Sequence, residues 1–243
     1  MSAIQPPRHL PWLMLPARTI LFAAWQAVIA LLYFLTGSSS PWEASTAWWT
    51  VTATLTNLVC IYLLIKLFKM ENLRYRNLFH FHRETVKTDL LWLLGLLVLS
   101  GPAAILPNYF VAQWLFGDSE AVLPLFFQPL PLWAILSTLV LFPLTIALAE
   151  IPTYFGYVMP RLEKQVGMWL AVLLSAFALA FQHGTLPLIF DVRFILWRLL
   201  MFVPFALLLA LALRWRPRLL PYMVIVHGLM DLSAAWMVYT ASI

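Results

Sequence analysis

Charged residues are scarce in this sequence, and their scarcity indicates the class of protein. Only 10% of the 243 residues are Asp, Glu, Lys or Arg, while 63% are apolar; an average soluble domain has roughly 25% and 45–50%. A soluble fold of this length has too little interior to bury so much apolar surface. The sequence also lacks the alternation of apolar and polar residues that marks the strands of a membrane β-barrel. The composition therefore predicts an all-α integral membrane protein.

Cysteine is almost absent. Cys60 is the single cysteine, which excludes an intrachain disulfide and leaves no disulfide evidence about the compartment. No small-residue cleavage pattern follows a charged start, so the first apolar run is interpreted as a retained span and not as a signal peptide. The net charge of +5 does not indicate nucleic acid binding, because basic residues gather in the cytoplasmic loops of membrane proteins.

Seven apolar runs approach the length of about 20 residues that a spanning helix needs. They predict one integral membrane domain over residues 1–243, a polytopic helical bundle in the lipid bilayer. An eighth span would require the runs around Ala121 or Pro187 to cross, and both look too short; Ala121–Pro131 is interpreted as an interfacial or re-entrant piece. The expected spans are Thr19–Thr36, Thr46–Phe68, Thr88–Leu106, Leu132–Tyr157, Val166–Gln182, Phe194–Leu213 and Leu219–Tyr239.

Basic residues alternate between the loops and predict the orientation. They precede span one, separate spans two and three, follow span four, and separate spans six and seven, while the other loops are acidic or nearly uncharged. The positive-inside rule then places the N-terminus in the cytoplasm and the C-terminus outside, in a plasma or bacterial inner membrane. Arg18 is interpreted as one of the charges before span one. The basic loop Lys66–Lys87 is interpreted as a topological anchor, with binding of anionic lipid or a substrate tail as the alternative.

Four ionisable residues lie within the expected spans: Glu150, His183, His227 and Asp231. An ionisable side chain at the centre of a span costs about 2.5–3.5 kcal/mol on insertion scales, so such residues usually face a protein interior and have a function. His227 and Asp231 are four residues apart and share one helix face. A glutamate beside a histidine is a general-base pair for water, and a second histidine can donate to an oxyanion.

Each of these residues also has a structural interpretation. Glu150 could be a protonated, hydrogen-bonded carboxyl, His183 an interfacial histidine, and His227 and Asp231 a pair that holds span seven. Glu150, His183 and His227 could alternatively bind Zn²⁺ or Fe²⁺, since glutamate and histidine are ordinary ligands. Without such a metal, no cofactor is expected.

The order of these residues resembles the CPBP family of intramembrane proteases, also called the Abi or CAAX-protease family. That family carries E-E-x-x-x-R, then F-x-x-x-H, then H-x-x-x-N or H-x-x-x-D. The third motif is complete from His227 to Asp231, and the second ends at His183 with Leu179 in place of phenylalanine. The resemblance covers residues 132–239 and implies a CAAX-protease-like core.

The first motif is degenerate. If Glu150 takes the first glutamate position, Ile151 replaces the second glutamate and Phe155 replaces the arginine. We expect this loss to leave Glu150 without a charge partner, with Tyr154 or Tyr157 supplying a substitute hydrogen bond.

The resemblance implies an endopeptidase that cleaves a membrane-embedded or lipidated peptide near the cytoplasmic face. Glu150 and His183 would activate water, and His227 and Asp231 would stabilise the oxyanion. The degenerate motif leaves open a non-catalytic membrane scaffold or immunity protein. A proton-coupled transporter is less favoured, because no internal repeat or pair of half-helices is found.

The depths of the site residues disagree. At 1.5 Å per residue, Glu150 lies about 10 Å from the cytoplasmic end of its span and His227 about 12 Å, but His183 lies about 25 Å along span five. The family interpretation therefore requires that span five begin later than Val166 or be strongly tilted.

Overall fold

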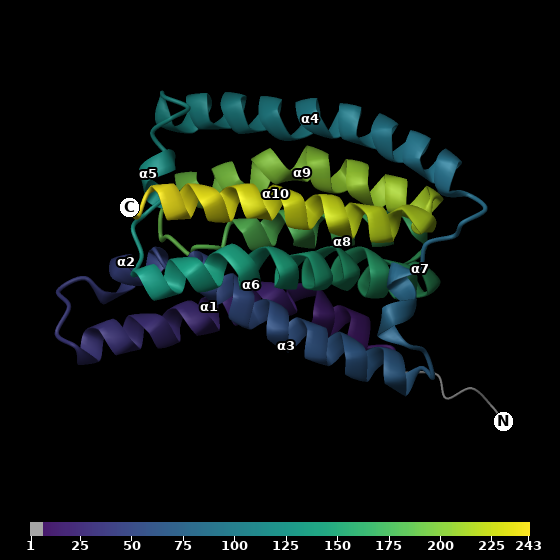
Figure 1. Cartoon of the computed structure of the whole chain (residues 1–243), viewed down its shortest axis with the longest axis horizontal. Coiled ribbons are helices and arrows are strands. Elements are labelled where there is room, and N and C mark those ends of the chain that lie inside the picture. The colour runs from purple at the N-terminus through teal and green to yellow at the C-terminus, as the bar shows by residue number, and fades with distance from the viewer. Residues whose placement is uncertain (1–6) are drawn as a thin grey trace.

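The computed structural model describes residues 7–243, and these residues form helices and no strands. Figure 1 shows the long helices running roughly along one common axis. They are α1 Leu10–Leu35, α2 Pro41–Thr46, α3 Trp49–Met70, α4 Val86–Phe116, α5 Leu123–Phe126, α6 Leu132–Ile151, α7 Met159–Val166, α8 Met168–His183, α9 Val192–Trp215 and α10 Leu220–Thr240. A π-helical segment, Pro152–Val158, joins α6 to α7, and short 3₁₀ helices lie at Tyr75–Phe79 and Pro217–Leu219.

The prediction of a polytopic all-α membrane bundle is confirmed. Among the described residues, six helices are long and apolar enough to cross a membrane, and α8 is a shorter apolar helix of 16 residues. The segment Ala121–Pro131 does not form a further span; it contains only the four-residue α5. The helices thus correspond to the seven expected spans, with α8 the shortest.

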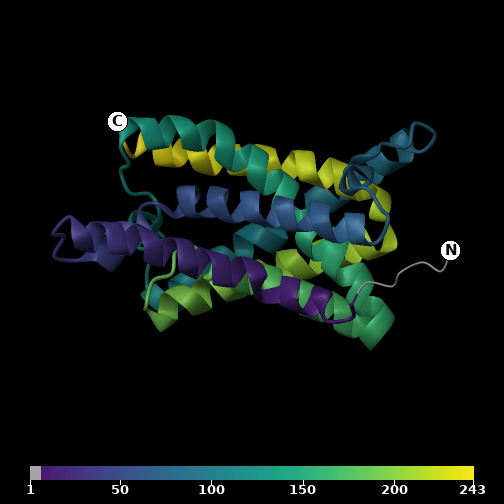
Figure 2. The ribbon, with the colours of Figure 1, turned by 90° about the horizontal axis from the view of Figure 1, so that it is seen from below.

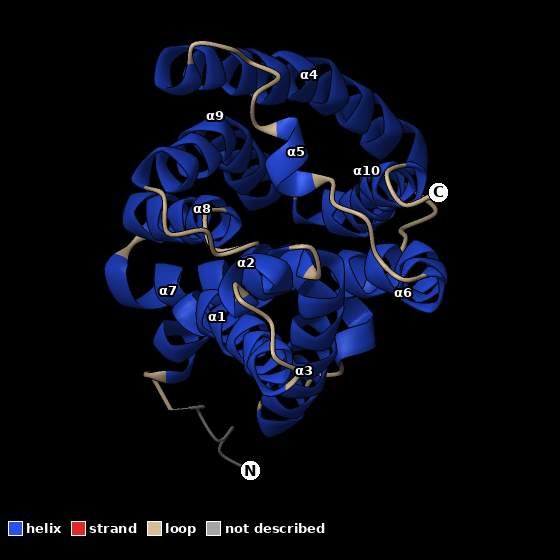
Figure 3. Cartoon of the chain, turned by 90° about the vertical axis from the view of Figure 1, so that its left-hand side faces the viewer, coloured by secondary structure: helices blue, strands red, loops and turns tan. Residues whose placement is uncertain are grey.

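The helices that carry the site pack around one another in the middle of the bundle. α6 packs against α10 and α3, and α8 packs against α9. α1 and α3 lie side by side on one face (Figure 2), and α1 also contacts α8. Seen from one end, α4 lies at the opposite edge and packs chiefly on α9 (Figure 3). α1 therefore lies against both α8 and α3, and α3 in turn packs on α6.

The fourth span continues well past its expected end at Tyr157. α6, the π-helical segment and α7 form one helix, Leu132–Val166. Pro152 has no N–H, so it cannot bond the carbonyl of Leu148 four residues earlier. The Tyr75 hydroxyl, from the loop after α3, donates to that carbonyl instead.

The first span begins at Leu10, nine residues before its expected start. Pro11 is favoured in a first helical turn because its missing N–H would have no partner there. The expectation that Arg18 precedes the span is therefore wrong, and this residue lies within α1. The buried residues of α1 follow one another at intervals of three or four, which is one helix face; they are Pro11, Met14, Arg18, Phe22, Gln26 and Ala30.

Candidate active site

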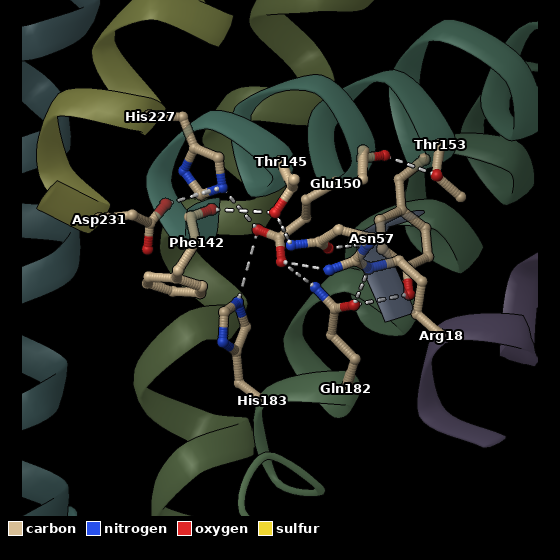
Figure 4. Close-up of polar contacts among 12 residues, drawn as sticks. Arg18, Asn57, Phe142, Thr145, Glu150, Thr153, Gln182, His183, His227 and Asp231 are labelled. Atoms are coloured by element: carbon tan, nitrogen blue, oxygen red, sulfur yellow. Dashed lines mark hydrogen bonds and ion pairs between the residues drawn. The ribbon is translucent and has the colours of Figure 1, made fainter. Parts of the chain in front are cut away.

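The four ionisable residues singled out in the sequence lie together. Figure 4 shows Glu150 of α6 with the rings of His183 and His227 on one side of its carboxylate. Glu150 Oε1 is 3.1 Å from His227 Nε2 and 3.8 Å from His183 Nε2. His227 Nε2 is also 3.3 Å from Asp231 Oδ2, one turn further along α10. Three helices thus contribute to one polar cluster.

The hairpin of α7 and α8 brings His183 to Glu150. Gly167 has a φ of +83°, a left-handed conformation that favours glycine, and there the chain turns back. Glu150 lies 17 residues before this turn and His183 lies 16 residues after it. Two antiparallel arms of nearly equal length bring their ends to nearly the same level, which removes the expected mismatch in depth. The mismatch arose because span four was ended at Tyr157.

A close contact between α10 and α6 brings His227 to the same carboxylate. A Cβ atom on Gly228 would lie 3.1 Å from the Ala147 Cβ and 3.3 Å from the carbonyl oxygen of Pro143. Small residues at a membrane helix interface allow such close approach of two backbones. Gly228 follows His227 directly, so this contact decides how far the imidazole extends toward Glu150.

The two oxygens of the Glu150 carboxylate have different surroundings. Oε2 accepts a hydrogen bond from Gln182 Nε2 at 2.6 Å and one from Arg18 Nη2 at 3.4 Å. Arg18 is 0% exposed and Gln182 is 0% exposed. Oε1 faces the two imidazoles, whose side chains are 14% and 13% exposed, and Asp231 beside them is 18% exposed. One oxygen is therefore held from the interior, and the other faces the more accessible side.

Arg18 also binds the groups around Glu150. Its Nε donates to Gln182 Oε1 at 2.7 Å, and its Nη1 donates to Asn57 Oδ1 at 2.8 Å. The expectation that Glu150 has no charge partner is therefore wrong. The cation comes from α1 rather than from the motif on α6, where Phe155 stands.

The tyrosines proposed as substitutes behave differently. The Tyr154 hydroxyl donates to Gln182 Oε1 at 3.1 Å and so joins the network. The Tyr157 hydroxyl has no hydrogen-bond partner among the described residues, and its ring lies 4.0 Å from the guanidinium of Arg161. Tyr157 therefore does not contribute to the site.

His183 is held by α9, through packing of its ring and a hydrogen bond to its backbone carbonyl. Its ring stacks on Phe202 of α9, with ring centroids 3.6 Å apart and planes 9° apart. Its carbonyl oxygen accepts a hydrogen bond from Arg198 Nε at 3.2 Å. Stacking leaves the ring edge, and with it Nε2, directed at Glu150.

Sequence reasoning missed three members of the cluster, and each has a recognisable signal. Arg18 falls on the inner face of α1 once the helix is counted from Pro11. Gln182 directly precedes His183. Asn57 is an amide inside an apolar span, where polar groups form interhelical hydrogen bonds; its Nδ2 donates to Thr145 Oγ1 at 3.2 Å.

The metal alternative requires a set of converging donors. Within residues 7–243, no three His, Cys, Asp or Glu side chains are placed so as to hold a metal ion. Glu150 and the two histidines lie together, but a single carboxylate oxygen faces both rings. This arrangement suits a carboxylate and imidazoles that share one small polar molecule.

The bundle and its buried polar cluster define a polytopic membrane protein with a glutamate–histidine site between its spans. Residues 130–233 match the family model described as Type II CAAX prenyl endopeptidase Rce1-like. The match over this segment, from just before α6 into α10, supports the assignment to the CPBP or CAAX-protease family that the motifs indicated. The chain matches none of the curated proteins and none of the solved structures with which it was compared. Arg18 and Asn57 lie outside the matched segment.

Proposed function

We propose that this protein is an intramembrane endopeptidase that hydrolyses a peptide bond of a membrane-embedded or lipidated peptide. The observation that carries the proposal is the position of Glu150 Oε1, which faces the Nε2 atoms of both His183 and His227. The family match supports CAAX-type endopeptidase activity. A prenylated C-terminal peptide is accordingly the first substrate to test.

Glu150 and His183 activate water in this proposal. The separation of 3.8 Å between Glu150 Oε1 and His183 Nε2 is too long for a direct hydrogen bond. It is a suitable separation for one water molecule that contacts both atoms. Glu150 removes a proton from this water as its oxygen attacks the scissile carbonyl carbon, and a tetrahedral intermediate forms.

His227 serves the oxyanion of that intermediate. An imidazole N–H at Nε2 donates to the oxyanion, which bears the charge displaced from the carbonyl. When the intermediate collapses, the C–N bond breaks and the leaving amine takes the proton that Glu150 received. Water and one peptide bond thus give one carboxylic acid and one amine, and Glu150 returns to its starting form.

Asp231 acts through His227. Its Oδ2 is 3.3 Å from His227 Nε2, and neither atom has a hydrogen-bond partner among the described residues. As a carboxylate, its negative charge stabilises a protonated imidazole, which leaves the Nε2–H available to the oxyanion. This role requires no proton on Asp231, unlike direct donation to the oxyanion.

The non-catalytic interpretation rests on the degenerate first motif, in which Phe155 stands in place of the arginine. Arg18 on α1 pairs with Glu150 instead, and this favours the catalytic interpretation. The metal-dependent alternative predicts that a chelator abolishes cleavage and that Zn²⁺ restores it, with Glu150, His183 and His227 as ligands. The side-chain mechanism predicts full activity in the chelator.

The orientation of the substrate follows from the charge distribution. We propose that the N-terminus and the basic loop Lys66–Lys87 lie in the cytoplasm, in agreement with the positive-inside rule. The peptide then approaches from the cytoplasmic face. Cysteine labelling of an engineered N-terminal thiol from each side of the membrane tests this orientation.

The proposal is tested with purified protein in lipid nanodiscs and an internally quenched, farnesylated peptide with a C-terminal CAAX sequence. Glu150→Gln should reduce kcat by about 10²–10⁴-fold, the usual contribution of a general base. The matched control is Glu163→Gln on the same continuous helix, which only removes an ion pair with Arg214. Cleavage by Glu150→Gln at the rate of the control variant would refute the proposed function.

A further inference from the structure

Arg18 is an unusual residue in its helix. α1 is mostly open to the membrane, with only 22% of its most apolar window buried. Arg18 nevertheless has no exposed surface, and it is among the largest fully buried side chains of the described residues. A charge buried in a membrane protein requires compensation by an opposite charge and by hydrogen bonds.

The hydrogen-bonding compensation comes from the site, and the Phe22 ring lies 5.2 Å from the guanidinium carbon. All three guanidinium nitrogens of Arg18 donate, to Gln182, Asn57 and Glu150. The planar guanidinium can hold three acceptors in fixed directions, which an ammonium group cannot do. The residue therefore connects α1 to α3, α6 and α8 at a single point.

Gln182 links Arg18 to the part of α8 that carries His183. Its side-chain oxygen accepts from Arg18 Nε at 2.7 Å, and its amide nitrogen donates to Glu150 Oε2 at 2.6 Å. An amide whose oxygen accepts from a guanidinium has its nitrogen directed away from it, here toward the carboxylate. His183 is the next residue in α8, so the same contacts fix the end of the helix that carries it.

We propose that Arg18 is the positioning cation of the site and that α1, which lies outside the family segment, is a functional part of it. Arg18 holds Glu150 Oε2, so that Oε1 points at the two imidazoles. Its positive charge also favours the ionised carboxylate, the form that a general base requires. This inference rests on the proposed function, and Arg18 itself touches neither water nor substrate.

A merely structural Arg18 would only hold α1 against the bundle. Gln26 has that kind of role two turns along the same inner face: its side chain bonds the backbone of Leu188 at 2.9 and 2.7 Å. Gln26 makes no contact with Glu150 among the described residues. Gln26→Met is therefore the matched control, a buried polar residue of α1 exchanged for an apolar one of similar size.

The experiment compares Arg18→Lys, Arg18→Met and Gln26→Met in nanodiscs, with the farnesylated peptide and only the folded, monodisperse fraction of each variant. Arg18→Met should lower kcat at least 100-fold, while KM changes less than threefold, because the substrate contacts remain. Arg18→Lys keeps the charge and loses the three-way geometry, so it should restore part of the lost kcat. Gln26→Met should lower the thermal stability and leave kcat within twofold.

An infrared measurement tests the effect of Arg18 on the protonation of Glu150 without a substrate. Arg18→Met should show the C=O stretch of a protonated carboxylic acid, and the double variant Arg18→Met/Glu150→Gln should lack it. Wild-type protein should lack this band as well, because its buried carboxylate is ionised.

The two proposals fail in different ways. A folded Arg18→Met protein with wild-type kcat and no new carboxylic acid band would overturn the role of Arg18, while an inactive Glu150→Gln variant would still support the endopeptidase. An active Glu150→Gln variant would overturn the endopeptidase mechanism. The infrared result would then still decide whether Arg18 holds Glu150 ionised.

Discussion

Replacing Gly228 by alanine measures how closely α10 must approach α6. The added methyl carbon would lie 3.1 Å from the Ala147 Cβ and 3.3 Å from the Pro143 carbonyl oxygen. Both separations are shorter than ordinary contacts, so α10 has to move away from α6 by a few tenths of an ångström. Neither neighbour is the end of a flexible side chain that could turn aside.

The displacement changes the proposed catalytic geometry. His227 precedes Gly228, and its Nε2 is 3.1 Å from Glu150 Oε1. A misplacement of about 1 Å costs on the order of 100-fold in rate, so a few tenths of an ångström should cost about 3–10-fold in kcat. Gly228→Leu cannot be accommodated by so small a movement, and we expect no measurable cleavage.

A second substitution supplies the internal check. Ala147→Gly removes one of the two contacts. The double variant Gly228→Ala/Ala147→Gly should therefore reverse about half of the increase in activation free energy that Gly228→Ala causes. Gly95→Ala is the matched control in α4, where an added Cβ meets nothing within 4 Å. It should raise helix stability by about 0.5–1 kcal/mol and leave cleavage unchanged.

The assay is the rate of farnesylated-peptide cleavage in nanodiscs, with thermal unfolding measured in parallel. A Gly228→Ala protein with wild-type kcat would refute the argument that the closeness of this contact sets the position of His227. Equal losses in the single and double variants would show that Ala147 is not the residue that obstructs the methyl group.

Two further predictions concern the supports of the site. Tyr75→Phe should lower the free energy of unfolding by about 1 kcal/mol, because the Leu148 carbonyl loses its donor; in a Pro152→Ala background the returned amide replaces the hydroxyl, and thermal unfolding should then show almost no effect of Tyr75→Phe. Asp231→Asn should lower kcat about 10–100-fold if the carboxylate acts through His227, since a neutral amide stabilises a protonated imidazole less than a carboxylate does. Wild-type kcat in Asp231→Asn would instead assign this position to direct donation.

Long apolar runs explain why the helices could be predicted. A span of about 20 apolar residues has few alternatives in a bilayer, so the expected spans coincide with the observed helices in their central parts. The ends were less predictable. Arg18 was taken as a charge outside the membrane, because a charge inside a span is costly and the compensating partners were not visible. The glutamate that compensates it is 132 residues away in the chain.

The four site residues were predictable for a related reason. Glu150, His183, His227 and Asp231 are ionisable groups within apolar runs, and the structure brings them together. Their catalytic roles stay predictions. The second set, Arg18, Asn57 and Gln182, depends on which helices are neighbours, and hydropathy alone does not contain that information. The carbonyl of Leu148, which Pro152 leaves without a backbone donor, was unpredictable for the same reason. Its donor, the Tyr75 hydroxyl, comes from a 3₁₀ helix between α3 and α4.

The nearly equal arms of the hairpin around Gly167 also restrict how this protein can vary. A single residue inserted between Glu150 and the turn would rotate the glutamate by about 100° and shift it by about 1.5 Å relative to His183. Length changes are tolerable in the loops before α6 and after α8, but within the hairpin only paired changes of whole helical turns in both arms preserve the facing positions. Substitutions can accumulate freely at the lipid-facing positions of this stretch, whereas its length cannot drift.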